Sequence, residues 1–167
     1  VFLFLISCIP AWAQETPKHK DTTRSCRIVF PERPNDAPKV AYLFDGEKSQ
    51  QVTLPSINFS EVIELSTGEI TIMMTPKKVT DIENLPLSAP RLIIPEGIQD
   101  FYIHVTPDST NSKLPLRLNL VNVGNGILKL GGTLWLNLTD YPIMAKLEGS
   151  KMTVPPKAQT GQVCAGR

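Results

Sequence analysis

Proline is the residue that most constrains what this chain can fold into. The 167 residues include 15 prolines, and most of them separate short apolar segments. Proline has no backbone N–H to donate, so it is confined to strand ends, sheet edges and turns, and it breaks the interior of a helix. The prolines that punctuate the chain in this way are Pro31, Pro34, Pro38, Pro55, Pro76, Pro86, Pro90, Pro95, Pro107, Pro115, Pro142, Pro155 and Pro156. This spacing leaves few windows long enough for a helix and predicts an all-β protein.

The segments between these prolines alternate apolar and polar side chains, which is typical of half-buried strands. Leucines occupy every second position within residues 114–123 and again within 133–138. Residues 61–74 predict a hairpin, with Gly68 at its turn. Other strands are expected at residues 26–30, 39–44, 50–54, 91–94, 100–105, 143–147 and 151–154. We predict an antiparallel β-sandwich of roughly 8–10 short strands over residues 24–156, followed by a flexible tail over 157–167.

The N-terminal segment predicts export. Residues 1–9 form an almost unbroken apolar run, and Ala11-Trp12-Ala13 is a small-x-small cleavage signature followed by polar sequence. These features belong to the second half of a secretory signal peptide, so we expect a leader over residues 1–13 and a flexible linker over 14–23. The expected destination is the periplasm or the extracellular space. An alternative takes Leu5-Ile6-Ser7-Cys8 as a lipobox, in which a lipid on Cys8 would be the protein's one contact with the membrane.

Export changes how the cysteines are interpreted. Cleavage after Ala13 removes Cys8 and leaves Cys26 and Cys164, an even number in an oxidising compartment. A disulfide between them would close a loop across the whole domain. On the chain-entropy account it would stabilise the fold by about 4–5 kcal/mol. The alternative is two separate thiols near the two ends of the chain.

One segment resembles a known class of protein. Residues 40–74 contain a strand ending in Asp45-Gly46, a second strand, and a hydrophobic hairpin with Leu65-Ser66-Thr67-Gly68 at its turn. This pattern is similar to that of exported bacterial β-sandwich modules of the immunoglobulin-like kind. The resemblance covers about a fifth of the chain. It implies an immunoglobulin-like fold and a non-enzymatic accessory or binding role, and it carries over no functional residues.

Two other segments resemble each other. Phe44-Asp45-Gly46-Glu47-Lys48 leads into Val52-Thr53-Leu54-Pro55, and Leu147-Glu148-Gly149-Ser150-Lys151 leads into Met152-Thr153-Val154-Pro155. Each has a strand, an acidic residue before glycine, a lysine, a second strand and a proline. The pattern is compatible with an internal duplication. Turn chemistry alone often produces such a similarity, so two turns that arose independently are the favoured interpretation.

No motif indicates catalysis, a cofactor or a metal. The two histidines are His19 in the expected linker and His104 in a predicted strand, where alternation points it outward. There is no Cys-x-x-Cys, no histidine pair at ligand spacing and no Gly-x-Ser-x-Gly elbow. Asp108, Ser109 and Ser112 lie near His104 in sequence, but they belong to a predicted turn. We therefore expect no catalytic, cofactor-binding or metal-binding residues and no cofactor.

The remaining hypotheses concern binding. The formal net charge is +1 with well-mixed signs, so nucleic acid is not an expected partner. Our first hypothesis is an exported, non-enzymatic structural or interaction module that contacts another envelope protein. The second is a glycan- or peptide-binding module that uses exposed aromatics, with Trp135 and Tyr102 as candidate contacts. Trp135 fits a second packed face equally well. A lesser alternative is a hydrolase with an unrecognised carboxylate site.

Overall fold

The chain folds entirely into β-structure. A computed structural model describes residues 23–79, 85–111, 113–124, 126–128, 132–147 and 149–163, with the backbone alone at 162 and 163. Within these ranges the chain forms twelve strands and no helix. The described part therefore contains no helix that is long and apolar enough to cross a membrane. The all-β class predicted from the proline spacing is confirmed.

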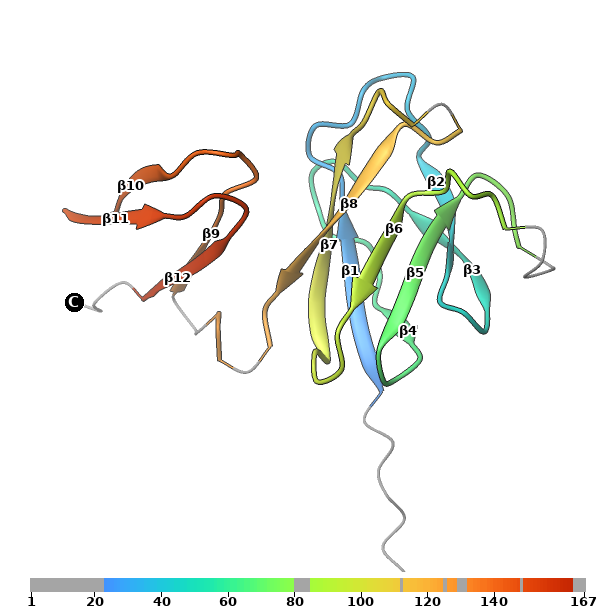
Figure 1. Ribbon diagram of the computed structural model, residues 1–167, viewed down its shortest axis with the longest axis horizontal. Helices are drawn as coiled ribbons and strands as arrows, with labels where there is room; N and C mark the ends of the chain where they lie inside the picture. Colours follow the sequence, from blue (N-terminus) through green and yellow to red (C-terminus); the bar gives the residue numbers. More distant parts are fainter. Residues whose placement is uncertain are drawn as a thin grey trace, which may run out of the picture.

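Eight of the strands form two four-stranded sheets (Figure 1). The first sheet has the order β4 (Ile63–Leu65), β1 (Arg24–Val29), β7 (Asp100–Pro107) and β8 (Leu116–Asn122). The second has the order β3 (Ser49–Thr53), β2 (Val40–Phe44), β5 (Ile70–Thr75) and β6 (Arg91–Ile94). Neighbouring strands are antiparallel except β1 and β7, which run parallel. We call residues 23–123, which contain both sheets, the two-sheet module.

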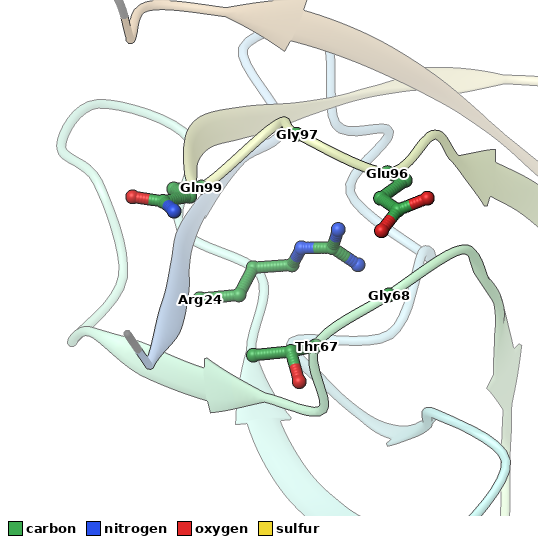
Figure 2. A pocket seen from close by; sticks show the side chains of 6 residues that line it. All are labelled: Arg24, Thr67, Gly68, Glu96, Gly97 and Gln99. Carbon is green, nitrogen blue, oxygen red and sulfur yellow. The ribbon is translucent and has the colours of Figure 1, made fainter. Parts of the chain in front are cut away.

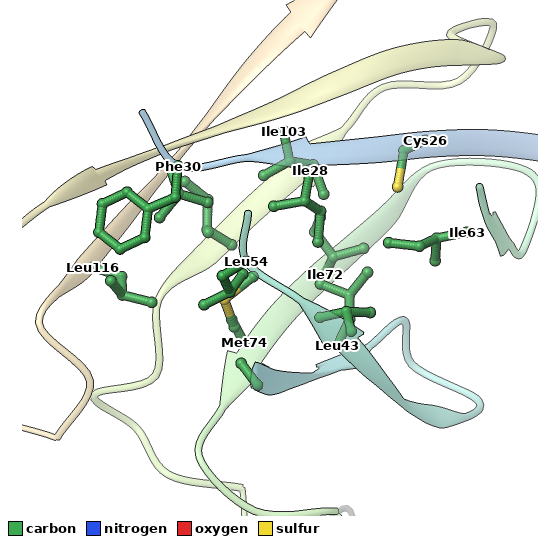
Figure 3. Close-up of a cluster of buried hydrophobic side chains, with 14 of the residues drawn as sticks. Cys26, Ile28, Phe30, Leu43, Leu54, Ile63, Ile72, Met74, Ile103 and Leu116 are labelled. Carbon is green, nitrogen blue, oxygen red and sulfur yellow. The ribbon is translucent and has the colours of Figure 1, made fainter. Parts of the chain in front are cut away.

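The two sheets share one hydrophobic core (Figure 3). Alternate residues of each strand point inward, so that Ile28 of β1 and Ile103 of β7 meet Leu43 of β2 and Ile72 of β5, and all four are fully buried. Burying a side chain of this size contributes about 1.5–3 kcal/mol relative to leaving it exposed. The period-two pattern in the sequence therefore determines which face of each strand builds the core.

The predicted hairpin over residues 61–74 is wrong. β4 pairs with β1 in the first sheet, whereas β5 pairs with β2 and β6 in the second. The turn between β4 and β5 therefore crosses from one sheet to the other, with Gly68 at φ 81°. Alternation identifies the buried face of a strand but not the strand beside it, and both arrangements bury the same side chains.

The last four strands form a small unit beside the two-sheet module (Figure 1). β9 (Gly132–Leu136) pairs antiparallel with β12 (Gln159–Val163), and β10 (Ile143–Leu147) pairs antiparallel with β11 (Ser150–Val154). We call residues 132–163 the C-terminal unit. The structure thus places β12 inside the segment from residue 157 onward that the sequence predicts to be a flexible tail. The segment QTGQV lacks a strand pattern of its own, and its ladder with β9 is a tertiary contact.

A buried asparagine joins the strands of the C-terminal unit. Asn137 directly follows β9 and is 1 % exposed. Its Nδ2 donates to the carbonyl oxygens of Tyr141, Val154 and Pro155 at 2.7, 3.1 and 2.9 Å. Its Oδ1 accepts from the backbone N–H of Thr139 at 2.9 Å and from the Thr139 hydroxyl at 2.8 Å. This one side chain therefore connects the end of β9 to both strands of the β10–β11 hairpin.

Candidate functional site

An apolar cleft lies between the outer face of the first sheet and the C-terminal unit. Its volume is about 420 Å³. The two-sheet module contributes Val29, Phe59, Tyr102, His104 and Val121, and the following segment contributes Leu128, Gly132, Thr133, Leu134 and Leu136. Strand side chains alternate between faces, so the residues next to the core positions of β1 and β7 point outward together. The cleft is therefore built from the faces of β1 and β7 that the core does not use, covered by β9.

Several contacts hold the C-terminal unit against the first sheet. The Nε2 of Gln159 donates to the Asn122 carbonyl at 2.7 Å, and the Asn122 N–H donates to Gln159 Oε1 at 3.1 Å. Gly161 approaches the preceding segment so closely that a Cβ atom there would lie 2.7 Å from the Ile127 carbonyl oxygen. Val121 is only 7 % exposed although it pairs with Tyr102 on the outer face. The C-terminal unit therefore packs against part of the outer face of the first sheet.

The aromatic part of the cleft is a stacked pair. The rings of Phe59 and Tyr102 lie 4.3 Å apart between centroids, with an interplanar angle of 29°. Phe59 comes from the segment between β3 and β4 and is 45 % exposed. Tyr102 is half-buried on β7. A stacked pair of this kind offers an apolar aromatic surface with a phenol at one end.

His104 contributes an uncharged imidazole to the cleft. Its side chain lies on the outer face of β7, as its alternation with Ile103 and Val105 predicts. Its Nδ1 is buried and has no hydrogen-bond partner among the described residues. Burial lowers the pKa of His104 below its ordinary value, and the charge of Glu32 opposes that shift. The histidine is therefore neutral at pH 7, which suits an apolar cleft.

Trp135 lies outside the cleft lining. It alternates on β9 with Leu134 and Leu136, which line the cleft, so its own side chain is on the opposite face of the strand. It is half-buried, and its Nε1 is enclosed without a partner among the described residues. Of the two aromatics proposed from the sequence, the structure places Tyr102 in the cleft and Trp135 behind it.

The residues that give the cleft its apolar character were not predicted from the sequence. Leu134 and Leu136 stand out as an alternating pair, but alternation alone does not distinguish a core face from a face that covers a neighbouring sheet. Phe59 lies in a segment without strand periodicity, so nothing in the sequence links it to Tyr102. The outward-facing Val29 of β1 and Val121 of β8 are the one available signal, because valine on the outer face of a sheet indicates that this face is covered.

A second cavity, of about 430 Å³, surrounds Arg24 at the start of β1 (Figure 2). The guanidinium points between two turns, and the residue is 2 % exposed. It donates to the carbonyls of Ile98, Ser66 and Pro95 at 2.7, 3.4 and 3.1 Å. Burial lowers the pKa of Arg24, and the nearby Glu96 opposes the shift. Since the guanidinium already binds three carbonyls, its role is to hold together the turns that follow β4 and β6.

Of the residues near His104 in sequence, Asp108 belongs to a hydrogen-bonded turn, and Ser112 lies outside the described residues. The carboxylate of Asp108 accepts from the backbone and hydroxyl of Thr110, and from Arg117 Nη2 at 3.0 Å and Nε at 3.2 Å. Hydrogen bonds from Thr110 lower the pKa of Asp108, and Arg117 adds to the effect. Asp108 therefore stabilises the turn between β7 and β8, as predicted for the segment that contains it.

Cys8 and Cys164 lie outside the described residues, so the disulfide between Cys26 and Cys164 and the lipid on Cys8 stay predictions. Cys26 is 2 % exposed beside Ile63 in the core (Figure 3). Burial raises the pKa of the Cys26 thiol to about 12. A thiol with this pKa is almost entirely protonated at neutral pH, and the thiolate is the reactive form.

Cys26 is therefore expected to resist alkylation by iodoacetamide in the folded chain and to react once the chain is unfolded in urea. Peptide mass mapping, with and without reductant, provides the measurement. A Cys26 peptide labelled on unfolding without reductant is a free thiol, whereas a peptide linked to Cys164 and released by reductant is the predicted disulfide. Rapid labelling of the folded chain would contradict the burial of the thiol.

The described residues hold no group of three or more histidine, cysteine, aspartate or glutamate side chains that could bind a metal ion. Comparisons with protein families, with curated proteins and with solved structures find no match to this chain. The cleft between the first sheet and the C-terminal unit is therefore the candidate site on the strength of its own geometry.

Proposed function

We propose that this protein is an exported, non-enzymatic interaction module whose cleft binds an apolar segment of a partner polypeptide. One observation carries the proposal: the cleft is about 420 Å³, mostly apolar, and built jointly by the two-sheet module and the C-terminal unit. Pockets of this size and composition are typical ligand sites in proteins. The leader expected over residues 1–13 supports a partner in the periplasm or at the cell surface.

The chemistry of the lining favours a peptide side chain. Leu134, Leu136 and Val121 offer surfaces that gain free energy by excluding water, at about 25 cal/mol per Å² of apolar area. The hydroxyls of Tyr102 and Thr133 are among the few polar groups, so recognition would depend on shape and apolar contact. A partly buried aromatic or aliphatic side chain with a nearby backbone polar group fits this arrangement.

One observation favours a second candidate, glycan binding. The Phe59–Tyr102 pair is a stacked aromatic surface with Phe59 45 % exposed, and sugar rings stack on such surfaces. The scarcity of hydrogen-bonding groups beside it makes this the less favoured ligand, because sugar hydroxyls need partners when they are buried.

Panning the immobilised full chain against a phage-displayed library of random peptides tests the proposal. We expect enriched peptides that share an aromatic or aliphatic residue, and we expect Phe59→Ser to weaken their binding about tenfold, or about 1.4 kcal/mol. Ile93→Ser is the matched control, because Ile93 is also exposed, at 61 %, but lies on β6 in the other sheet.

Binding that Ile93→Ser and Phe59→Ser weaken equally would contradict the cleft as the site. Binding of the chain to an oligosaccharide array tests the second candidate, glycan binding. Glycan binding that is lost in Tyr102→Ala, without any enriched peptide, would replace the peptide proposal with the glycan one.

We also propose that the two-sheet module is an immunoglobulin-like sandwich. Its two facing, largely antiparallel sheets of short strands and its length of about 100 residues support the proposal. An experimental structure that shows a closed barrel in place of two separate sheets would overturn it.

A further inference from the structure

His104 lies where the two-sheet module and the C-terminal unit meet. Its backbone is paired with Val29 of β1 on one side and with Asn119 of β8 on the other. Its side chain lines the cleft on the outer face of β7, and Leu134 and Leu136 line the wall that β9 contributes. The charge of this one imidazole therefore bears directly on the contact between the module and the unit.

The buried nitrogen of His104 lacks a hydrogen-bond partner. Within the described part of the chain, no group donates to its Nδ1 or accepts from it. The amide of Asn119, across the ladder, donates instead to the His104 carbonyl at 3.0 Å and to the Thr106 hydroxyl at 3.2 Å. A neutral imidazole carries an N–H on one nitrogen, whereas the imidazolium carries one on both. Protonation in the closed cleft would therefore leave a charged N–H buried without an acceptor, which is unfavourable.

The charges around the ring give an imidazolium little support. Among the described residues that line the cleft, the other titratable side chain is Tyr102. Arg27 of β1 and Arg117 of β8 lie two positions along from the residues that pair with His104, and both are exposed cations, which disfavour a second positive charge. Glu32, after β1, is the carboxylate that favours it. Burial outweighs Glu32, so the pKa of His104 is lower than its ordinary value.

The other described contacts between the module and the unit keep the same charge near neutral pH. The side-chain amide of Gln159 is bonded to the backbone of Asn122 at 2.7 and 3.1 Å, and the remaining cleft walls are mostly apolar. An unperturbed histidine changes its charge between about pH 5 and 8, whereas amides and aliphatic side chains do not titrate. Within the described part of this contact, His104 is therefore the group whose charge changes in that range.

We propose that acid opens the cleft: protonation of His104 separates β9 and the rest of the C-terminal unit from the outer face of the first sheet. The open arrangement brings the imidazolium into water, so a proton favours it over the closed one. The closed arrangement holds the pKa of His104 below the ordinary value of 6.5. Its advantage is therefore fully present well above pH 6.5 and is lost as the pH falls below that value. Opening does not depend on what the cleft binds, whereas the release of a peptide in acid also rests on the proposed function.

Thiol labelling of the full chain measures the opening without a ligand. Leu134→Cys places a thiol in the cleft wall. Its rate of reaction with N-ethylmaleimide in the urea-unfolded chain, divided by its rate in the folded chain at the same pH, gives a protection factor. Protection should fall about three- to tenfold between pH 7.5 and 5.5, and the upper figure is the limit for an exposed histidine that titrates at about pH 6.5. Peptide mass mapping distinguishes this thiol from the natural cysteines.

Two further substitutions in the Leu134→Cys chain identify the histidine responsible. His104→Phe keeps an aromatic ring in the cleft but cannot be protonated, so protection should be the same at both pH values. His19→Gln is the matched control, because His19 is the other histidine and lies outside the described residues, and it should leave the fall unchanged. His104→Gln, which is also neutral, replaces the phenylalanine variant if that chain does not fold. Titration of the His104 ring followed by nuclear magnetic resonance should give a pKa below 6.5.

A fall in protection of less than about threefold would overturn the proposal, and so would an equal fall in the His104 variants. A His104 pKa at or above 6.5 would do the same. Peptides that bind the cleft should lose affinity by about the same factor between these pH values, except when they bind His104→Phe. Affinity that stays constant while protection falls would contradict the release of a peptide in acid. If no peptide binds, the proposed function fails, and the labelling still decides whether acid opens the cleft.

Discussion

Replacing Ile94 with alanine is expected to lower the free energy of unfolding of the two-sheet module by about 2–5 kcal/mol. Ile94 is the last residue of β6 and has no exposed surface. Truncating this side chain loses the free energy gained by burying the removed atoms. It also leaves a cavity, because the two packed sheets cannot close around the empty space. Urea unfolding followed by far-ultraviolet circular dichroism provides the measurement.

The adjacent residue supplies the control. Ile93 is also an isoleucine of β6, but it points away from the core and is 61 % exposed. Ile93→Ala should change the free energy of unfolding by less than about 1 kcal/mol, since surface substitutions rarely do more. Equal effects of the two substitutions would mean that β6 does not have one face on the core.

Asn137→Ala is expected to unfold the C-terminal unit while the two-sheet module stays folded. The substitution removes the donor that the carbonyls of Tyr141, Val154 and Pro155 share. The bond to the Val154 carbonyl is buried, and leaving a buried group unsatisfied costs about 1–3 kcal/mol. A unit of four short strands has little stability in reserve. Hydrogen exchange should show loss of amide protection across residues 132–163 and retained protection in β1, β7 and β8.

Asn58→Ala is the control for this experiment, because Asn58 is an exposed asparagine of the two-sheet module. It should leave exchange unchanged throughout. If Asn137→Ala also removed protection from β1 and β7, the module and the unit would unfold as one cooperative body. The assignment of Asn137 as the local connection would then be wrong.

The core was the most predictable part of the protein. Leu116, Leu118 and Ile103 occupy alternate positions in their strands, and all three are buried as that pattern requires. The neighbours of each strand within the two sheets were less predictable. The turn at Gly68 has the composition of a hairpin, yet it connects strands of different sheets, because alternation contains no information about the neighbour across a ladder.

The cleft depends even more on tertiary structure. Tyr102 could be proposed from the sequence as an exposed aromatic, but its stacking with Phe59 joins segments that are 43 residues apart in the chain. Leu134 looks like a core leucine by its pattern and instead covers the outer face of another sheet. Trp135 turns away from that face. One-dimensional periodicity distinguishes the two faces of a strand, and it does not identify what each face meets.

By itself, the sequence determined the all-β class, the positions of most strands and the side chains that enter the core. Proline position and period-two alternation are local properties of the chain, so they can be deduced without knowing the fold. Only the tertiary structure decided the crossing at Gly68, the strand β12 and the apolar cleft. Each of these depends on which distant segments pair or pack. That choice is made by the burial of surface and the pairing of backbone groups across the whole chain.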